Sequence, residues 1–385
     1  MKRGSFELMK KMNQQIILKI ISSDKSTSRA KIAEITGLSP AAVSNNVKEL
    51  LEMGLLKETE HGESRGGRKP VLLEMNPEGA YFIGLEWGIA EVRGVLLDLN
   101  KKIVSRCEEK VDSFQLESFV DLSRKIVDEL INQLVETERI YGLGVGVHGM
   151  VDPERGYSLF APHFGWRDLP IKERLEEEFQ IPVFIDNDVR VMALAEKWNA
   201  KDNFLLINTG PGIGAAIVFD GKLHYGRDYS AGEFGHTTVM KDGPLCSCGN
   251  RGCLEALIST DNLVYHYNPD IAGEITKNEI SEKWLDILAD AREGREKALE
   301  IINMIIEYLG MGLSNLVNLL NPDEIVLAGD FTLAADLLLP LLKEELKAKT
   351  LAIPGRELSL VVTDFGEWLG AVGGAAVVLE KFFLD

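Results

Sequence analysis

The chain has 385 residues, of which 45% are hydrophobic and 26% are charged, and its formal net charge is −18. This composition is typical of a globular protein with two or three domains, and it excludes disordered, collagen-like and low-complexity chains. The sequence holds neither an apolar run of about 18 residues nor a secretory leader, so we expect a cytoplasmic protein with no membrane span.

Charge is divided unevenly along the chain. Residues 1–75 hold 13 Lys and Arg against 9 Asp and Glu, a net charge of +4, so the rest of the chain carries −22 to give the total of −18. An acidic body repels nucleic acid, and any contact with a polyanion is therefore expected from the basic head.

The head shows the pattern of a helix-turn-helix. Apolar spacing predicts helices over 6–21 and 29–36 and a third that begins at Pro40, with Gly37 in the turn and Ser39 as the N-cap. In this motif the N-terminal part of the last helix enters the major groove. The residues expected to face DNA there are Ser39, Ala41, Ser44, Asn45, Asn46 and Lys48. Asn suits adenine and Lys suits phosphate, while the alternative is a three-helix bundle without a DNA function.

A basic loop follows the third helix. Two predicted strands, over 55–58 and 71–74, flank a glycine-rich loop that carries Arg65, Arg68 and Lys69. Arg side chains suit a narrow minor groove, so the loop is interpreted as the wing of a winged helix-turn-helix domain over 1–75. A solvated basic hairpin is the alternative.

Three of the four cysteines fall close together. Cys246, Cys248 and Cys253 follow His236 by ten or more residues, and Gly249 and Gly252 lie between them. Three thiolates and an imidazole form a closed tetrahedral set for structural zinc, with no open position for catalysis. Three buried free thiols are the alternative.

The turn residues 76–80 predict a linker, and strands and helices then alternate, which predicts an α/β body. Over nearly its full length the chain resembles the ROK family of repressors, open reading frames and kinases. The motifs that carry the resemblance are Gly144-Val-Gly-Val-His-Gly149, Asp186-Asn-Asp188, Gly210-Pro-Gly-Ile-Gly214, and Glu233-Phe-Gly-His236 with the cysteine cluster and Glu255.

The resemblance implies two lobes of the actin and hexokinase type, with sugar bound between them. The first lobe is expected over 81–195, completed by a C-terminal helix over 368–385, and the second over 196–367 with the zinc site. The apolar stripe from Ile301 to Leu320 in the second lobe is expected to be core or a dimer interface. The implied sugar-binding residues are Gly149, Asn187, Asp188, Glu233, His236 and Glu255, and His163 is a further candidate.

The nucleotide side departs from the kinases of the family. Their first phosphate loop reads Asp-x-Gly-Gly-Thr-Lys, whereas this chain has Glu86-Trp-Gly-Ile-Ala-Glu91, and Asp330 stands where glycine is usual. Added negative charge opposes a polyanion, so ATP and magnesium are not expected as cofactors. Gly210, Gly212 and Gly214 look like a residual phosphate loop, and Asp188 matches the general base of the kinases.

The sequence thus predicts a sugar-responsive repressor that binds palindromic operator DNA as a homodimer or tetramer. Glucose is the expected effector, ahead of xylose, mannose and N-acetylglucosamine. The enzyme alternative is an ATP-dependent hexose kinase with a regulatory head. A third possibility is a regulator whose acidic body is sequestered by a sugar-transport protein.

Overall fold

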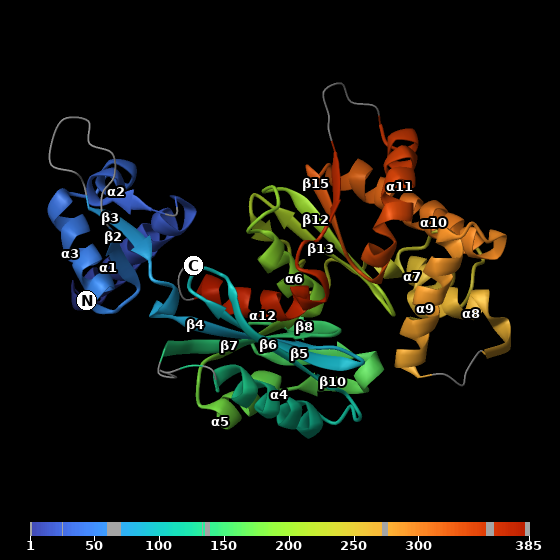
Figure 1. The fold of residues 1–385 in the computed structure, drawn as a ribbon, viewed down its shortest axis with the longest axis horizontal. Helices are drawn as coiled ribbons and strands as arrows, with labels where there is room; N and C mark the ends of the chain where they lie inside the picture. Colours follow the sequence, from blue (N-terminus) through green and yellow to red (C-terminus); the bar gives the residue numbers. More distant parts are fainter. Residues whose placement is uncertain are drawn as a thin grey trace.

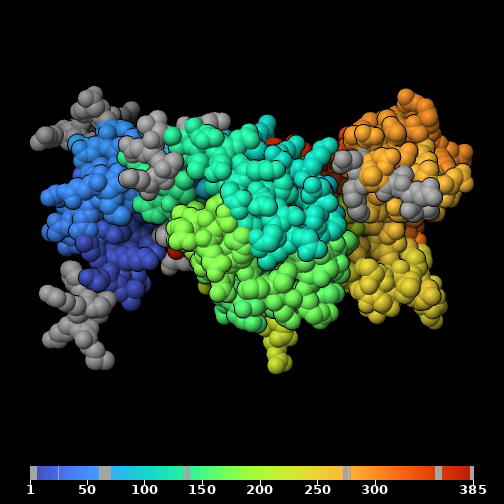
Figure 2. All heavy atoms as spheres, turned by 90° about the horizontal axis from the view of Figure 1, so that it is seen from below, coloured from blue at the N-terminus to red at the C-terminus, as the bar shows by residue number. Residues whose placement is uncertain are grey.

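The computed structural model describes residues 2–24, 26–59, 71–132, 134, 139–271, 276–351 and 358–381. Three parts lie in a row, with the head at one end, the first lobe in the middle and the helical region of the second lobe at the other end (Figures 1 and 2). Among the described residues, no helix is long and apolar enough to cross a bilayer.

The head is a three-helix domain with a small antiparallel sheet of order β1-β3-β2. Its elements are α1 (Lys2–Asp24), β1 (Thr27–Ser28), α2 (Arg29–Thr36), α3 (Pro40–Glu52), β2 (Leu56–Thr59) and β3 (Leu72–Met75). The hydroxyl of Ser39 caps α3 by accepting a hydrogen bond from the Ala42 amide at 3.2 Å, and Gly37 ends α2 with a positive φ of 68°. These signals confirm the predicted helix-turn-helix. The wing residues Arg65, Arg68 and Lys69 lie outside the described residues.

The predicted linker is a folded turn. Residues Pro77–Gly79 form the short helix η1. On the head side, the Asn76 side chain donates to the Gly54 carbonyl at 2.7 Å. On the body side, the Leu99 amide donates to the Pro77 carbonyl at 3.1 Å, and the Arg139 guanidinium donates to the Glu78 carbonyl at 2.6 Å. The turn is therefore bonded to both of its neighbours.

The first lobe is built on a five-stranded sheet of order β11-β7-β4-β5-β6. A three-stranded sheet of order β10-β9-β8 is added to it. The elements are β4 (Tyr81–Trp87), β5 (Glu91–Asp98), β6 (Ile103–Lys110), α4 (Leu116–Ile131), β7 (Ile140–Val147), β8 (Met150–Asp152), β9 (Tyr157–Ala161), η3 (Pro162–Phe164), β10 (Trp166–Leu169), α5 (Ile171–Phe179), β11 (Val183–Asn187) and α6 (Asp188–Glu196).

The C-terminal helix α12 (Leu369–Leu379) packs on the sheet of this lobe and is shorter than the predicted range 368–385 among the described residues. It crosses the face of the sheet opposite α4 and α5 (Figure 1). Only glycine allows this approach, because a Cβ on Gly84 would lie 2.0 Å from the Ala371 carbonyl and one on Gly144 would lie 1.9 Å from the Gly374 carbonyl. The run of small residues in α12 thus brings helix and sheet backbones into contact.

The second lobe has a sheet of order β14-β13-β12-β15-β16 covered by helices. Its elements are β12 (Phe204–Thr209), β13 (Ile213–Phe219), β14 (Lys222–Leu223), η4 (Phe234–His236), α7 (Leu254–Ile258), α8 (Thr260–Tyr267), η5 (Pro269–Ile271), α9 (Lys277–Arg292), α10 (Glu296–Leu320), β15 (Glu324–Gly329), η6 (Asp330–Ala334), α11 (Ala335–Lys349), β16 (Ser359–Val362) and η7 (Gly366–Trp368). On α10, Ile301, Ile305, Leu309 and Leu313 are buried in the core of this lobe.

Helix α6 lies between the two lobes. Its buried side chains share one apolar cluster with α12 on the first lobe and with β12 and β13 on the second. The same cluster continues through Phe82 and Ala80 into the head. Because α6 begins with Asp188, a candidate sugar-binding residue stands at the start of a helix whose apolar cluster extends through all three parts.

Candidate functional site: a polar cleft beside a metal centre

The first half of the site lies where two neighbouring strands end. Strands β7 and β11 are parallel and adjacent, with Asn187 in register with Val147. Polar groups that follow such strands gather at one edge of the sheet. The Asn187 amide donates to the Gly149 carbonyl at 2.9 Å and to Asp188 Oδ1 at 2.7 Å. Gly149 has φ of 94°, and a Cβ there would lie 2.5 Å from the Phe160 carbonyl, so the turn requires glycine.

The second lobe supplies the other half. Glu255, at the start of α7, accepts a hydrogen bond from the Ile213 amide at 3.2 Å. A Cβ on Gly212 would lie 3.4 Å from Glu255 Oε2 and 4.0 Å from His148 Cε1, so Gly212 lies between side chains from both lobes. Burial raises the pKa of Glu233, and the charges of Asp188 and Glu255 raise it further against the opposing charge of His236. The predicted sugar-binding carboxylates are therefore within electrostatic reach of one another.

Two histidines extend this cluster. His148 Nδ1 lies 3.1 Å from Asp188 Oδ2, and His148 Nε2 lies 3.0 Å from His163 Nδ1. His163 is exposed and precedes Phe164, whose ring packs 5.1 Å from Phe119 and 4.8 Å from Trp166. The sequence did not predict a role for His148, because its contact with Asp188 joins residues that are 40 positions apart in the chain.

A buried ion pair lies next to Asn187 and Asp188, and the sequence did not predict it. Arg190 donates through Nε to Asp186 at 2.6 Å, and its two other nitrogens donate to the carbonyls of Tyr229 at 2.7 Å and Val151 at 2.8 Å. The side chains of Arg190 and Asp186 are only 4% and 3% exposed. Arg190 thereby ties α6 to the loop before Glu233, where Tyr229 has a positive φ of 57°.

His236, Cys246, Cys248 and Cys253 form a compact donor set beside the cleft. Their ligand atoms all lie within 4.8 Å of one another, with Cys246 Sγ 3.5 Å from His236 Nδ1 and Cys248 Sγ 3.7 Å from Cys253 Sγ. A tetrahedral zinc ion with bonds of about 2.3 Å to sulfur and about 2.0 Å to nitrogen separates its ligands by about 3.5–3.8 Å. The four residues therefore fit a zinc ion, and the other nitrogen of His236 lies 3.9 Å from Glu233 Oε2.

The nucleotide side of the cleft holds carboxylates. Asp330 accepts a hydrogen bond from the Thr260 hydroxyl at 2.7 Å, and its Oδ2 would lie 3.3 Å from a Cβ on Gly210. On the first lobe, Glu91 is hydrogen-bonded to Arg93, which stands opposite Glu86 across β4 and β5. Burial raises the pKa of Glu86 to about 7, and its Oε2 has no hydrogen-bond partner among the described residues.

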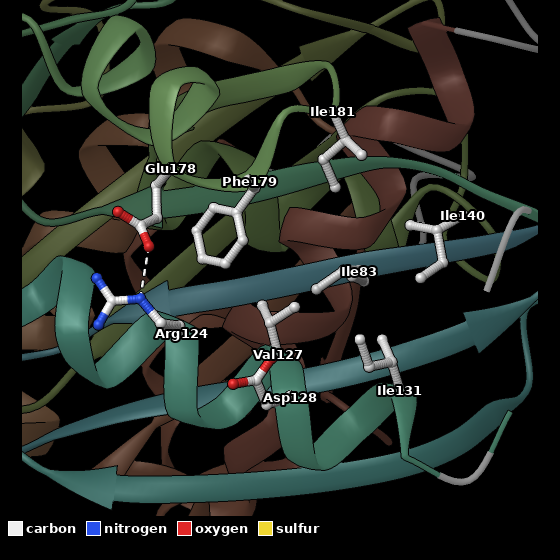
Figure 3. A pocket seen from close by; sticks show the side chains of 9 residues that line it. All are labelled: Ile83, Arg124, Val127, Asp128, Ile131, Ile140, Glu178, Phe179 and Ile181. Carbon is white, nitrogen blue, oxygen red and sulfur yellow. Dashed lines mark hydrogen bonds and ion pairs between the residues drawn. The ribbon is translucent and has the colours of Figure 1, made fainter.

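A cavity of about 480 Å³ lies at the other end of the first-lobe sheet (Figure 3). It is lined by Ile83, Arg124, Val127, Asp128, Ile131, Ile140, Glu178, Phe179 and Ile181. Ile140 begins β7, whereas the candidate sugar site follows the last residue of that strand. Arg124 and Glu178 are bonded to each other at 2.5 Å, and most of the lining is apolar. The polar side chains of the lining are Arg124, Asp128 and Glu178, so this cavity is mainly apolar and is separate from the predicted sugar site.

Five of the six residues on and before α3 that are predicted to contact DNA are exposed, and one is not. Ser39, Ala41, Ser44, Asn45 and Lys48 are exposed, with Lys48 Nζ 3.7 Å from Glu52. Asn46 is a correction. It is only 7% exposed and donates back to the Ala42 carbonyl at 2.8 Å, because it lies on the same helix face as Val43, Val47 and Leu50. That spacing was available in the sequence and places Asn46 in the core.

The assembled features define a sugar-kinase-like body joined to a DNA-binding head, and the comparisons identify the family. The ROK family profile matches residues 82–381, and a winged helix-turn-helix DNA-binding profile matches residues 13–57. The chain therefore belongs to the ROK family, and both the predicted fold class and the predicted resemblance are confirmed.

Two similar proteins match nearly the whole chain, and a third matches about three quarters of it. The xylose repressor of Bacillus subtilis is 30% identical, with 97% of this chain and 96% of that protein covered. A crystal structure of a ROK family transcriptional regulator, described as a homologue of the E. coli MLC protein, matches with a TM-score of 0.82, 26% identity and 97% coverage of each chain. A ROK family glucokinase from Streptomyces griseus in complex with glucose and AMPPNP matches 77% of this chain and 99% of its own, with a TM-score of 0.67 and 26% identity.

Proposed function

We propose that the protein is a sugar-responsive transcriptional repressor. The observation that carries the proposal is that one chain joins a winged helix-turn-helix head to a body in which polar groups from both lobes lie close together. Asn187 and Asp188 from the first lobe meet Glu255 and Glu233 from the second. A neutral ligand rich in hydroxyls satisfies such a cluster, because each hydroxyl both donates and accepts.

The effector in this proposal is a monosaccharide. Glucose is the expectation from the sequence, and xylose is favoured by the similar repressor of Bacillus subtilis. These two pyranoses share the configuration of their ring hydroxyls and differ by one exocyclic hydroxymethyl group. The hydroxyl-binding residues can therefore serve either sugar, and the space around the hydroxymethyl group decides between them.

A structural zinc ion belongs to the proposal. His236, Cys246, Cys248 and Cys253 would hold it, and the ion would fix the loop that carries Glu233 and the segment that leads into Glu255. Since His236 offers its second nitrogen toward the cleft, the metal orients a recognition residue and does no chemistry. Zinc supplies folding energy at such a closed site.

Sugar binding is proposed to reach the head through α6 and the turn at residues 76–80. Closure of the lobes moves α6, which contacts both sheets, and the apolar cluster around it continues to the head. A ligand shifts an equilibrium only through unequal affinity for its two states. Lobe closure would supply this difference in affinity, because carboxylates from both lobes can bond the same sugar only when the lobes are closed. Two heads in a dimer would then read a palindromic operator.

The test is fluorescence anisotropy of zinc-loaded protein on DNA from upstream of its own operon, at one fixed salt concentration, with glucose, xylose, mannose and N-acetylglucosamine. Salt is fixed because phosphate contacts make affinity steeply salt-dependent. We expect one sugar to change tight, sequence-specific binding. Glu233→Ala should abolish the response and keep DNA binding, whereas Glu307→Ala, on the exposed face of α10, should change neither. Absence of specific DNA binding with every sugar would refute the repressor.

An ATP-dependent hexose kinase is the second candidate. It is favoured by Asp188, by the Gly210 loop and by the likeness to a glucokinase. The charges of Asp330 and Glu86 oppose it, because they line the side where the phosphates of ATP would lie. Phosphorylation of a hexose that Asp188→Asn abolishes would establish the kinase. Binding of a sugar-transport protein by the acidic body stays a prediction that a pull-down with uptake proteins tests.

A further inference from the structure

His148 is held between a carboxylate and a second imidazole. Its Nδ1 lies 3.1 Å from Asp188 Oδ2 and its Nε2 lies 3.0 Å from His163 Nδ1, with the ring 23% exposed and the Asp188 side chain 14% exposed. Asp188 itself is fixed, because its Oδ1 accepts from the Asn187 amide at 2.7 Å and from the Val189 amide at 2.9 Å. Both nitrogens of His148 are therefore engaged in one orientation.

This chain of contacts dictates where the protons sit. An ionised carboxylate only accepts, so the nitrogen of His148 that faces Asp188 carries a hydrogen in every state. The other nitrogen of His148 then either donates to His163, when His148 is cationic, or accepts from it, when His148 is neutral. A neutral His163 then has its hydrogen on Nε2 in the first case and on Nδ1 in the second. Protonation of His148 thus changes Nε2 of His163 from a hydrogen-bond acceptor into a donor.

The surroundings favour the cation. The ionisable groups that face His148 are Asp188 on α6, His163 on η3, Glu255 on α7 and Glu233 before η4. Burial alone lowers the pKa of His148, but the hydrogen bond and charge of Asp188, followed by the charges of Glu255 and Glu233, outweigh it and raise the pKa above its ordinary value. The ring of Phe164 packs 5.8 Å away and holds no charge.

We propose that His148 and His163 form a proton switch in the sugar cleft, in which a proton on His148 strengthens effector binding and makes Nε2 of His163 a hydrogen-bond donor. The proposal rests on the proposed function, because it needs a sugar in this cleft. It makes His148 a positioning residue that acts on the ligand through Asp188 and His163.

The direction of the effect follows from charge. A bound sugar excludes water from between Asp188, Glu233 and Glu255, so their repulsion and their attraction for a cation both grow. In the empty cleft the attraction of these carboxylates already exceeds the effect of burial, so we expect the complex to hold the proton of His148 more tightly than the empty cleft does. By linkage, sugar affinity is highest below the pKa of His148 in the empty cleft, and it is lost as the pH rises through the higher pKa of the complex.

The experiment is calorimetric titration of the full-length, zinc-loaded protein with D-glucose and with D-xylose, from about pH 6 to about pH 8.5, a range that spans the titration of a histidine with a raised pKa. We expect the dissociation constant to increase about three- to tenfold over this range, with proton uptake on binding. His148→Gln keeps a donor to Asp188 but cannot titrate, so its profile should be flat. His163→Gln should keep part of the slope. His266→Gln, an exposed histidine on α8, is the matched control and should keep all of it.

A second measurement tests the switch without a ligand. Nitrogen NMR of the histidine rings should show His148 titrating above an ordinary histidine with its hydrogen on Nδ1 when neutral, and His163 exchanging its tautomer in the same pH range. A flat wild-type profile with measurable sugar affinity overturns the switch and leaves the proposed function intact. A full slope in His148→Gln also overturns it. Absence of sugar binding at every pH overturns the proposed function, and the coupling with it.

Discussion

The two sides of the cleft differ in how far they keep the chemistry of a sugar kinase. On the sugar side, Asn187, Asp188 and Glu255 are fixed by hydrogen bonds, and the cysteine cluster stands behind them. On the nucleotide side, the Asp330 carboxylate lies beside Gly210, and Glu86 is buried with no hydrogen-bond partner for its Oε2 among the described residues. In the proposed function, the scaffold keeps the residues for sugar recognition, whereas acidic side chains stand where the family kinases bind the phosphate donor.

The sharpest way to break the sugar side is to remove a metal ligand. Cys246→Ser should release the zinc ion and disorder the segment between His236 and Glu255, with a loss of sugar affinity of about 100-fold or more. Metal analysis and calorimetry measure the two effects. Cys107→Ser is the matched control, since Cys107 lies in β6 and bonds to Glu129 at 3.0 Å. Unchanged sugar binding in metal-free Cys246→Ser would separate the two sites.

The second largest effect is expected from loss of the ion pair between Arg190 and Asp186. Arg190→Ala leaves Asp186 buried without its ion partner and removes the bonds to Tyr229 and Val151, so we expect the free energy of unfolding to fall by about 3–5 kcal/mol. Denaturant titration measures it. Arg227→Ala, at a side chain that is 95% exposed, should change stability by less than about 0.5 kcal/mol. A similar, small loss in both variants would show that Arg190 is dispensable.

On the nucleotide side, burial of Glu86 lowers the free energy of unfolding in a pH-dependent way. Burial raises its pKa from 4.5 to about 7, so between these values the folded state holds a proton that the unfolded state has released. Stability from this group is present below about pH 4.5 and is lost as the pH rises through about 7. Glu86→Gln should therefore gain up to about 2–3 kcal/mol above pH 7, and nothing at low pH. Denaturation at several pH values checks this, with Glu307→Gln as the control, and a gain that does not depend on pH would contradict it.

The smallest effect is expected from Asp330→Gly. Removal of one carboxylate beside Gly210 should raise the affinity for a fluorescent magnesium–ATP analogue by about fivefold, because a like-charge contact of this kind is worth about 1 kcal/mol. Glu86 and Glu91 remain, so binding stays weak. Thr260→Val loses the hydrogen bond to Asp330 but keeps the charge, and it should leave nucleotide affinity unchanged. An equal gain of nucleotide affinity in both variants would contradict the charge explanation and would point to a change in the mobility of the Gly210 loop.

Local signals in the sequence were sufficient for much of the fold. Gly37 and Ser39 predicted the end of the second helix and the start of the third at Pro40, as the structure confirms, and Ser28 caps the second helix. The wing strands are shifted by one residue, to Leu56–Thr59 and Leu72–Met75. The first helix runs over Lys2–Asp24 and is longer than its apolar stripe, because the polar residues at its ends are compatible with a helix.

The site was predictable only where a motif marked it. The family motifs placed Asn187, Asp188, Glu233 and Glu255 in one cleft, and the spacing of the cysteines predicted the donor set. Arg190 could not be understood from its neighbours in sequence, because two of its partners, Val151 and Tyr229, are each 39 residues away. The contact of His148 with Asp188 likewise exists only once β7 and β11 are side by side.

The turn at Pro77–Gly79 has a consequence for the DNA that the protein can use. A flexible tether would let each head search a volume, and operators with varied spacing would be tolerated. Here the turn is bonded to the head through Asn76 and to the body through Pro77 and Glu78. These bonds restrict the orientation of the head relative to the body. In an assembly of two chains, the arrangement of the two bodies would then determine the spacing and the helical phase of the DNA half-sites that the two heads can bind.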